Sequence, residues 1–429
     1  MLTVYIVLLF AVPSNLQWTA LGSLGKPATL WGLVLLLWWV LSQLRPRGDT
    51  RGTPVRAVPM LFVLFCVVVL VSFASAMLRG QPADQIGSAM TSLVRVASWA
   101  GVLLVVSDGI HTRNELVTLM RRLSISVAIL ASLGAVQIFV GSTLLEWTGS
   151  IPGWQIEWGS MDTRGGMFRP VGTATHPLEF SSTLTVLLPV TIAYAAIRMR
   201  GADRAGWRWV LPPLLALALL SMTMTRSAVI GVAVGLTMLL PSLPSGFRKR
   251  MLVAIALGGV AIAVAFPRVV LTTLGTFTGV SDDPSAQSRL SGLSRVPEFA
   301  SSSPLIGAGW GTFFPRYYIF DNAWMLTLIE AGVLGVVVFG AMMITGFVNA
   351  ARAARRAAYA DRRVIAGSFA ASLAAATVVL ALFDGLSFGM FAGTLFLLLG
   401  LATAAWTLAQ SDEPVTSAPD ALVRGSSAR

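Results

Sequence analysis

Long apolar stretches alternate with short polar connectors along almost the whole chain. The hydrocarbon core of a membrane is about 30 Å thick, so a helix that crosses it needs about 20 mostly apolar residues. By this measure the sequence predicts an all-α polytopic membrane protein with about 12 transmembrane helices. The predicted segments are residues 2–21, 28–44, 57–78, 88–107, 118–142, 176–197, 209–224, 226–243, 251–267, 321–348, 364–384 and 388–408. We expect one transmembrane domain over residues 1–408 and a cytoplasmic, disordered polar tail over residues 409–429.

Residues 209–240 fit either one helix or two. A single straight helix would be about 48 Å long at 1.5 Å per residue, too long for the bilayer unless strongly tilted. Basic residues stand before it, in residues 198–208, and after it, in residues 248–250. Because basic connectors remain in the cytoplasm, both must lie on the same side. Two crossings are therefore predicted, with Thr225 and Arg226 at the turn.

Basic residues are distributed unevenly between the two sides of the predicted bundle. With connectors alternating between sides, 21 of the 31 Lys and Arg residues fall on one side and nine on the other, and Arg95 lies within a helix. The positive-inside rule then places both termini in the cytoplasm. It also places two long connectors, residues 143–175 and 268–320, on the outer side. Long connections within compact folds are often functional, so we expect the site in these outer loops.

The composition is that of a protein whose surface lies largely in lipid. Hydrophobic residues make up 55% of the chain and charged residues 12%, against about 25% charged residues in soluble proteins. The net charge is +12, yet no basic and aromatic residues interleave as in a nucleic-acid groove. Nucleic acid is therefore not an expected partner. With one cysteine and only His111 and His176 as histidines, we expect no intrachain disulfide, no metal site and no cofactor.

Several arginines stand on the outer side, where the charge distribution disfavours them: Arg164, Arg169, Arg226 and Arg289. An arginine fork binds phosphate oxygens at two points and stays charged when partly buried. A group of such residues therefore predicts a site for a lipid-linked pyrophosphate. The alternative for each arginine alone is contact with lipid head groups or water, which we favour for all but Arg226. A charge near apolar helix interiors is costly and usually functional.

His176 stands at the start of a predicted helix, directly before Pro177. One interpretation is helix architecture, in which Thr175 caps the helix, Pro177 suits its first position and Glu179 favours its dipole. The other interpretation is that the imidazole contacts substrate. The sequence supports both equally.

Asp321 and Asn322 begin another predicted helix at the outer side. Both residue types cap helices well, but a carboxylate here is also suited to accept a proton from a sugar hydroxyl. Asp321 is therefore a candidate catalytic base. Earlier in the chain, Gly307 and Gly309 permit a tight turn or a close approach of the backbone to a ligand. They join Asn322 as candidates for substrate binding.

Three segments occur in an order that is specific as a set. They are GMFRPVGTATHPLEFSSTLTVLLPV, the hairpin TMTRSAVIGVAVG, and SRLSGLSRVPEFASSSPLIGAGWGTF running into DNAWMLTLIEAGVLG. Together they give a small-residue turn entering a helix, a Thr-Arg pair, and a glycine turn before a helix. Over about residues 160–345 the chain resembles the O-antigen ligase and polysaccharide polymerase superfamily of bacterial membrane glycosyltransferases.

The resemblance implies a metal-independent reaction at the outer face of the bacterial inner membrane, in cell-envelope polysaccharide synthesis. An acceptor hydroxyl on a glycan or lipid would displace pyrophosphate from an undecaprenyl-pyrophosphate-linked glycan and invert the anomeric centre. By match to the family, pyrophosphate binding falls to Arg226, Arg169 and Arg289. The family commonly has His-Asn where this chain has Asp321-Asn322, so a carboxylate would take the place of an imidazole. Ligase and polymerase are not separated.

Two other classes of function are open. A transporter or flippase of lipid-linked oligosaccharides should show pseudo-symmetric halves and polar residues through the bilayer midplane. Arg95, Glu330 and Asp384 are isolated candidates for such residues. A scaffold of an envelope-synthesis complex would use its arginines only to touch lipid head groups. Incubation with a lipid-linked oligosaccharide separates the three classes: a transferase makes new glycosidic bonds, a flippase translocates the lipid, and a scaffold does neither.

Overall fold

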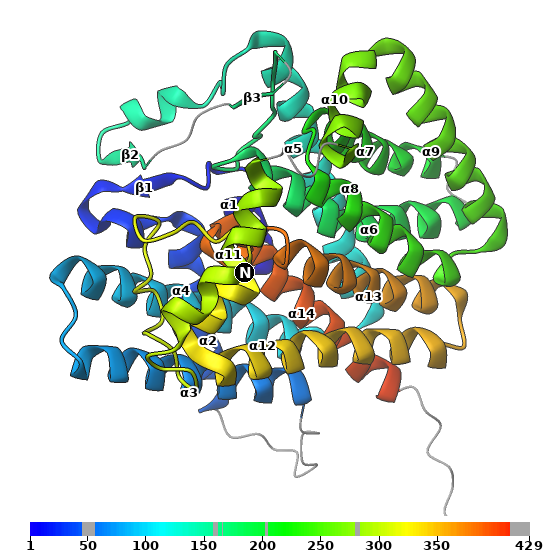
Figure 1. Cartoon of the computed structure of the whole chain (residues 1–429). Coiled ribbons are helices and arrows are strands. Elements are labelled where there is room, and N and C mark those ends of the chain that lie inside the picture. Colours follow the sequence, from blue (N-terminus) through cyan, green and yellow to red (C-terminus); the bar gives the residue numbers. More distant parts are fainter. Residues whose placement is uncertain (45–55, 158–161, 165, 202–204, 279–283, 412–429) are drawn as a thin grey trace, which may run out of the picture.

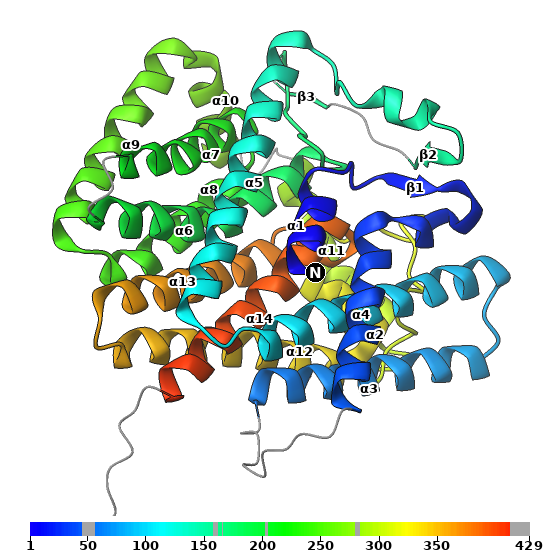
Figure 2. The same ribbon diagram turned by 180° about the vertical axis from the view of Figure 1, so that it is seen from behind.

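The computed structural model describes residues 1–44, 56–157, 162–164, 166–201, 205–278 and 284–411, most of which are helical. The α-helices are α1 (Leu2–Phe10), α2 (Pro27–Gln43), α3 (Ala57–Leu78), α4 (Ala83–Gly109), α5 (Arg113–Val140), α6 (Pro177–Arg200), α7 (Leu211–Met222), α8 (Arg226–Leu239), α9 (Ser245–Ala265), α10 (Pro267–Thr278), α11 (Pro284–Ala300), α12 (Ala323–Arg356), α13 (Ala360–Leu380) and α14 (Gly389–Ser411). Two antiparallel strand pairs are formed by β1 (Leu16–Trp18) with β2 (Trp154–Ile156) and by β3 (Thr163–Arg164) with β4 (Met167–Phe168). Helices α6 and α14 are buried over most of their length, and α4, α5, α7, α8, α12 and α13 each pack against one or both of them, whereas α9 and α10 lie at the periphery (Figures 1 and 2).

Seven of the described helices are long and apolar enough to cross a membrane: α3, α4, α5, α6, α12, α13 and α14. Two bent pairs, Thr19–Gly25 with Pro27–Gln43 and Ser245–Ala265 with Pro267–Gly275, raise the number to nine if each pair is one crossing. Helices α7 and α8 are separate, as predicted, but short, with 12 and 14 residues. The all-α fold with several helices able to span a membrane is confirmed; the count of about 12 crossings is not.

Prolines account for two departures from the predicted spans. The predicted helix over residues 2–21 stops at Phe10, shortly before Pro13, and the chain continues into β1, which pairs with β2. A proline has no N–H to continue a helix and disfavours helical conformation in the residue before it. Likewise, Pro267 stands at the 103° bend between α9 and α10. Helices α10 and α11 consequently occupy much of the connector that the hydropathy assigns to an outer loop.

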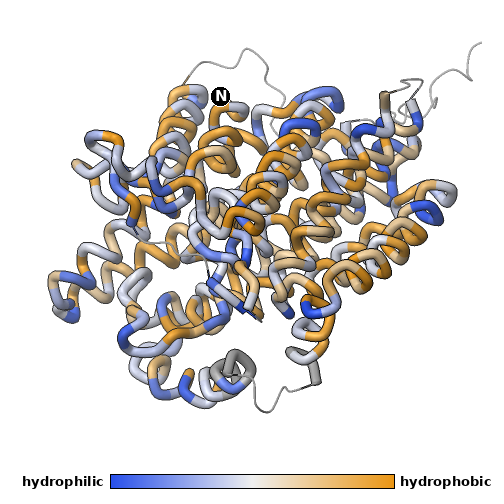
Figure 3. The backbone as a smooth tube through the Cα atoms, turned by 90° about the horizontal axis from the view of Figure 1, so that it is seen from above, coloured by the Kyte–Doolittle hydropathy of each residue, from blue (hydrophilic) through white to orange (hydrophobic). Residues whose placement is uncertain are grey.

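Connectors gather at two opposite ends of the bundle. At one end Arg56 pairs with Asp108 at 2.5 Å, and Asp361 lies 2.7 Å from Arg113 and 3.5 Å from Arg200. These ion pairs join the ends of α3, α4, α5, α6 and α13, as the alternating topology requires. We call this the basic end. Between the two ends the helices are mostly hydrophobic, with hydrophilic residues toward helix ends and connectors (Figure 3).

The opposite end, which we call the loop end, carries strands β1–β4 and the segment 303–316. Lys26, just before α2, pairs with Glu157, just after β2, at 2.7 Å. Arg79, just after α3, donates through Nη2 to the carbonyl of Gly307 at 3.0 Å. The first contact joins the N-terminal segment to the first long connector, and the second joins the end of α3 to the glycine turn.

Helix α12 is broken at Gly332, where φ is 68° and ψ is −170°. The segment before the helix fills this break. The N–H of Ala308 donates to the carbonyl of Ile329 at 2.8 Å, and the N–H of Val333 donates to the carbonyl of Pro304 at 2.9 Å. Backbone groups inside an apolar bundle need partners from the protein itself, and here a loop supplies them.

Candidate functional site

Two arginines at the loop end converge on the turn between α7 and α8. Arg164 lies in β3 and Arg169 directly follows β4, so the pairing of these strands holds them close together. Nη1 of Arg164 donates to the carbonyl of Met224 at 3.0 Å, and Nε of Arg169 donates to the carbonyl of Thr223 at 2.9 Å. Helix α8 begins at Arg226, immediately after the turn. The structure therefore brings three predicted site arginines to one turn.

The turn between α7 and α8 has the electrostatics of an anion site. Helix α8 starts here, so its first N–H groups contribute partial positive charge. Thr225 stands at the capping position but makes no side-chain capping bond; its hydroxyl pairs with that of Thr223 at 2.9 Å. The charge of Arg226 opposes the α8 dipole. Helix stability therefore does not explain an arginine at this position.

Arg169 is the most deeply buried of the three arginines, with 4% of its surface exposed. Its Nη1 group pairs with Asp162 at 2.7 Å. Its Nη2 group is buried and has no hydrogen-bond partner among the described residues. Burial lowers the pKa of the guanidinium, and the hydrogen bond to Asp162 opposes that effect. A buried N–H without an acceptor is costly, so Arg169 retains one donor for a ligand.

The structure supports the helix-architecture interpretation of His176, and its contact with substrate stays a prediction. His176 is the N-cap of α6, because Nδ1 accepts from the N–H of Leu178 at 3.1 Å. The expectation that Thr175 caps the helix is wrong: the N–H of Thr175 donates to Glu179 instead. Burial and the charge of Arg169 lower the pKa of His176. The imidazole is thus neutral near pH 7 and, with Nδ1 as an acceptor, carries its proton on Nε2.

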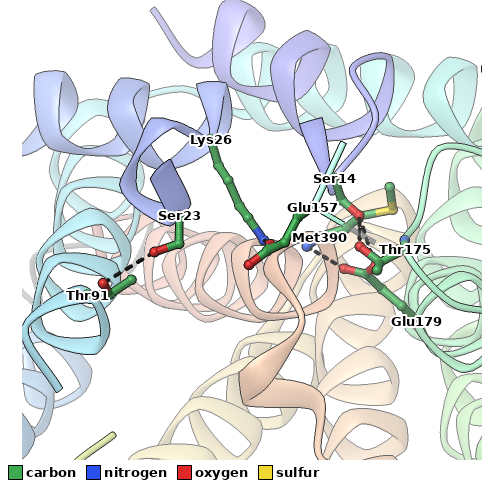
Figure 4. A network of polar contacts seen from close by, with 8 residues as sticks. All are labelled: Ser14, Ser23, Lys26, Thr91, Glu157, Thr175, Glu179 and Met390. Carbon is green, nitrogen blue, oxygen red and sulfur yellow. Dashed lines mark hydrogen bonds and ion pairs between the residues drawn. The ribbon is translucent and has the colours of Figure 1, made fainter. Parts of the chain in front are cut away.

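A buried carboxylate fixes the start of α6 (Figure 4). Glu179 is fully buried, and its Oε2 accepts from the hydroxyl of Ser14 at 3.0 Å and from the N–H of Thr175 at 2.8 Å. Its Oε1 accepts from the N–H of Met390, at the start of α14, at 2.7 Å. Charge-assisted bonds of this kind are among the strongest in proteins. Glu179 therefore positions His176 rather than contacting a ligand.

A cavity of about 190 Å³ lies beside this region. Three charged side chains face it from different parts of the chain: Arg95 from α4, Glu330 from α12 and Asp384 from the segment after α13. Trp99 and Trp310 contribute aromatic walls. The sequence treats the three charged residues as isolated, and the structure corrects this. The signal for each was a charge within or beside an apolar helix, but their grouping is a tertiary property.

Asp321 and Asn322 divide the capping and charge roles at the start of α12. Oδ1 of Asn322 accepts from the N–H groups of Trp324 at 2.9 Å and Met325 at 3.1 Å, so Asn322 is the cap. Asp321 is not needed for that purpose. Its charge instead acts on Asp384, at the edge of the cavity. Two carboxyl groups from separate elements therefore lie near each other at the loop end.

Burial raises the pKa of Asp384 to about 6, with a further contribution from Asp321, while the hydrogen bond from Ser387 and the charge of Arg95 oppose the shift. A carboxyl group with this pKa is suited to take up and release a proton near neutral pH. One of its oxygens, Oδ1, is buried and without a hydrogen-bond partner among the described residues.

Replacement of Asp384 by asparagine is expected to stabilise the protein at neutral pH. Because the folded-state pKa is raised, the contribution of this group to stability is complete below its ordinary value of 3.8 and is lost as the pH rises through about 6. The Tm of Asp384→Asn should exceed that of the wild type by about 1–3 °C at about pH 7.5 and match it at about pH 4. Glu146→Gln, an exposed carboxylate at the same end, is the control. An Asp384→Asn protein less stable at both pH values would contradict the assignment.

The remaining predicted residues have other surroundings. The φ angles of Gly307 and Gly309 are 76° and 134°, and a Cβ on Gly307 would lie 2.2 Å from the carbonyl oxygen of Glu330. Close approach of the backbone to α12 thus accounts for Gly307, and a ligand-binding role for either glycine stays a prediction. The side chain of Arg289 lies outside the described part of the structure.

The described residues contain no group of three or more His, Cys, Asp or Glu side chains that could hold a metal ion. What the loop end does offer is a set of guanidinium groups at a helix start, a neutral imidazole and paired carboxyl groups beside a cavity. Such a set can bind an anion and exchange a proton.

Several helices long and apolar enough to cross a membrane indicate a multi-pass α-helical membrane protein. Neither a protein-family model nor a curated protein sequence matches the chain.

Proposed function

We propose that this protein transfers a glycan from an undecaprenyl-pyrophosphate-linked donor to an acceptor hydroxyl, as a ligase of the O-antigen type or as a polysaccharide polymerase. The observation that carries the proposal is the convergence of Arg164 and Arg169 on the turn that leads into Arg226. A pyrophosphate has several anionic oxygens, which suit two-point binding by arginine forks and helix N–H groups. The buried donor of Arg169 that has no partner among the described residues is consistent with the same ligand.

In the proposed reaction, the acceptor oxygen attacks the anomeric carbon of the donor sugar. The bond from that carbon to the pyrophosphate oxygen breaks, and the arginines stabilise the charge that develops on the leaving group. The acceptor proton passes to a carboxylate. Asp321 is the base suggested by sequence, and Asp384, with its raised pKa and unpaired oxygen, is a second carboxylate at the same end.

The proposed setting is the bacterial inner membrane, with the basic end and both termini in the cytoplasm and the loop end facing outward. The gathering of basic connectors at one end supports this orientation. In a Cys66→Ser background, a cysteine at exposed Ser302 should react with a membrane-impermeant maleimide in intact cells. A cysteine at exposed Ala358 should react only after permeabilisation. The reverse pattern would place the site in the cytoplasm and remove the lipid-linked donor from reach.

The decisive assay uses the purified protein in liposomes with an undecaprenyl-pyrophosphate-linked oligosaccharide and a glycan acceptor. A transferase makes new glycosidic bonds and releases undecaprenyl pyrophosphate, and it does so without added metal. A flippase is the second candidate, favoured by the charged group of Arg95, Glu330 and Asp384 within the bundle and by the cost of such charges in a membrane. It would move the lipid between leaflets without forming bonds. If neither bond formation nor translocation is observed, a scaffold role remains.

A further inference from the structure

The cavity beside Asp384 is built from four separate elements. Its walls come from α4, from residues 310–315, from the first turns of α12 and from residues 384–387. Exposed Pro315 and Ser387 stand on its rim, so it opens at the loop end. Phe388, directly after the rim, contacts the ring of His176, with 6.4 Å between ring centroids. The mouth of the cavity thus adjoins the arginine-bearing turn through one pair of rings.

The polar lining offers donors and acceptors that the protein leaves open. Arg95 faces the cavity from α4, and among the described residues it interacts with Asp384 and Glu157 by charge alone, without a hydrogen bond. Oδ1 of Asp384 is buried and unpaired. Glu330 is already engaged, since its Oε1 accepts from the N–H of Phe313 at 3.2 Å. Arg95 and Asp384 attract each other, but polar atoms without hydrogen-bond partners inside an apolar bundle are still expensive. A ligand with matching groups would offset that cost.

The charges and rings select the chemistry of such a ligand. Two carboxyl groups disfavour a phosphate, and the guanidinium disfavours a bare cation. The aromatic walls are held rigidly: Trp99 stacks on Phe396 with centroids 4.8 Å apart, and Trp310 meets Phe65 edge-on at 5.5 Å. Flat apolar rings suit the C–H face of a sugar ring, while its hydroxyls both donate and accept hydrogen bonds. A cavity of about 190 Å³ admits a single ring and no long glycan.

We propose that this cavity binds one neutral pyranose ring of the acceptor glycan, with Arg95 donating to and Asp384 accepting from its hydroxyls. The proposal rests on the proposed function, because a glycan acceptor is what brings a sugar to this site. It places the acceptor next to the donor pyrophosphate, with His176 and Phe388 between them. It also gives specificity a location, since the ring that fits the cavity decides which acceptor is used.

The test is saturation-transfer NMR on purified protein in phospholipid nanodiscs. Maltoside detergents are avoided because their head group is itself a pyranose. The probes are the methyl glycosides of glucose, galactose, mannose, rhamnose, N-acetylglucosamine and N-acetylgalactosamine. At least one should receive magnetisation on its ring protons. Arg95→Gln and Asp384→Asn should each weaken that binding by about tenfold, as expected for a lost hydrogen bond to a charged group.

Three further variants sharpen the result. Glu146→Gln makes the same carboxylate-to-amide change outside the cavity and should bind the sugar as the wild type does. Trp310→Phe keeps an aromatic ring and leaves the charged residues of the cavity unchanged. Reduced transfer by folded Trp310→Phe would therefore show that this cavity wall contributes, even if Arg95→Gln fails to fold. Arg226→Ala should still bind the sugar while losing glycan transfer. If the wild type binds the sugar but transfers no glycan, the proposed transferase function is contradicted and sugar binding by the cavity is not.

Two outcomes would overturn the cavity proposal. One is that no probe binds the wild type. The other is that a probe binds equally well to folded Arg95→Gln, Asp384→Asn and Trp310→Phe, which would place the sugar elsewhere even if transfer activity is found.

Discussion

Arg226→Ala is expected to lower glycan transfer by about 100- to 1,000-fold, the usual effect of removing one group that stabilises a developing negative charge. The comparison applies to protein that inserts and accumulates normally, and the start of α8 does not need this charge, because it opposes the helix dipole. The measurement is the rate of undecaprenyl-pyrophosphate release by purified protein, beside its thermal unfolding profile.

Two companion variants make this result specific. Arg226→Lys keeps the charge but loses the planar fork, so it should recover only part of the activity. Arg295→Ala removes an exposed arginine that lies over Tyr318 at the same end, and it should transfer glycan at the wild-type rate. If folded Arg226→Ala also transfers normally, then Arg226 does not hold the pyrophosphate.

The second large effect is on folding. In Gly332→Ala, the new Cβ would lie 2.3 Å from the backbone of Leu305, at a position with φ of 68°. The strained conformation costs about 1–3 kcal/mol and the forced packing about as much again. Because the loop before α12 pairs with both sides of this break, the loop cannot move away without losing its hydrogen bonds. We expect little folded protein, measured as the fraction that elutes as a single species after extraction.

Gly340→Ala is the matched control for this change. Gly340 lies on the same helix in helical conformation, and the nearest atom to its Cβ position is Cζ3 of Trp324 at an ordinary 3.8 Å. Alanine should be tolerated there, or stabilise the helix by up to about 1 kcal/mol. Equal yields of folded Gly332→Ala and wild type would show that the break in α12 tolerates a side chain at residue 332, contrary to this prediction.

Hydropathy and charge predict the long helices because both are local properties of the chain. The separation of α7 from α8 follows from the basic residues on both flanks, and the structure confirms it. The shortness of α1 and the bend before α10 depend on Pro13 and Pro267, which a window average of hydropathy hides. A count of apolar segments therefore exceeds the number of helices that can cross.

The candidate site divides in the same way. Arg164, Arg169 and Arg226 can be selected from sequence because a cation on the outer side is unusual there, but their meeting depends on the β3–β4 pair. The cavity is less accessible to sequence reasoning. Arg95 and Asp384 are far apart along the chain, and only the packing of α4 against the segment before α14 brings them to one space. The cap formed by His176 likewise cannot be predicted from the sequence, because histidine is not a preferred capping residue.

The hydrogen bonds of Glu179 also bear on the order of assembly. The N–H that completes its shell belongs to Met390, 211 residues later in the chain. During synthesis, α6 is therefore made long before its carboxylate can be fully satisfied inside the bundle. Only when α14 joins does the start of α6, and with it the imidazole of His176, take its final position. A chain that stops short of α14 would insert most of its helices, but the start of α6 at the loop end would not be fixed in position.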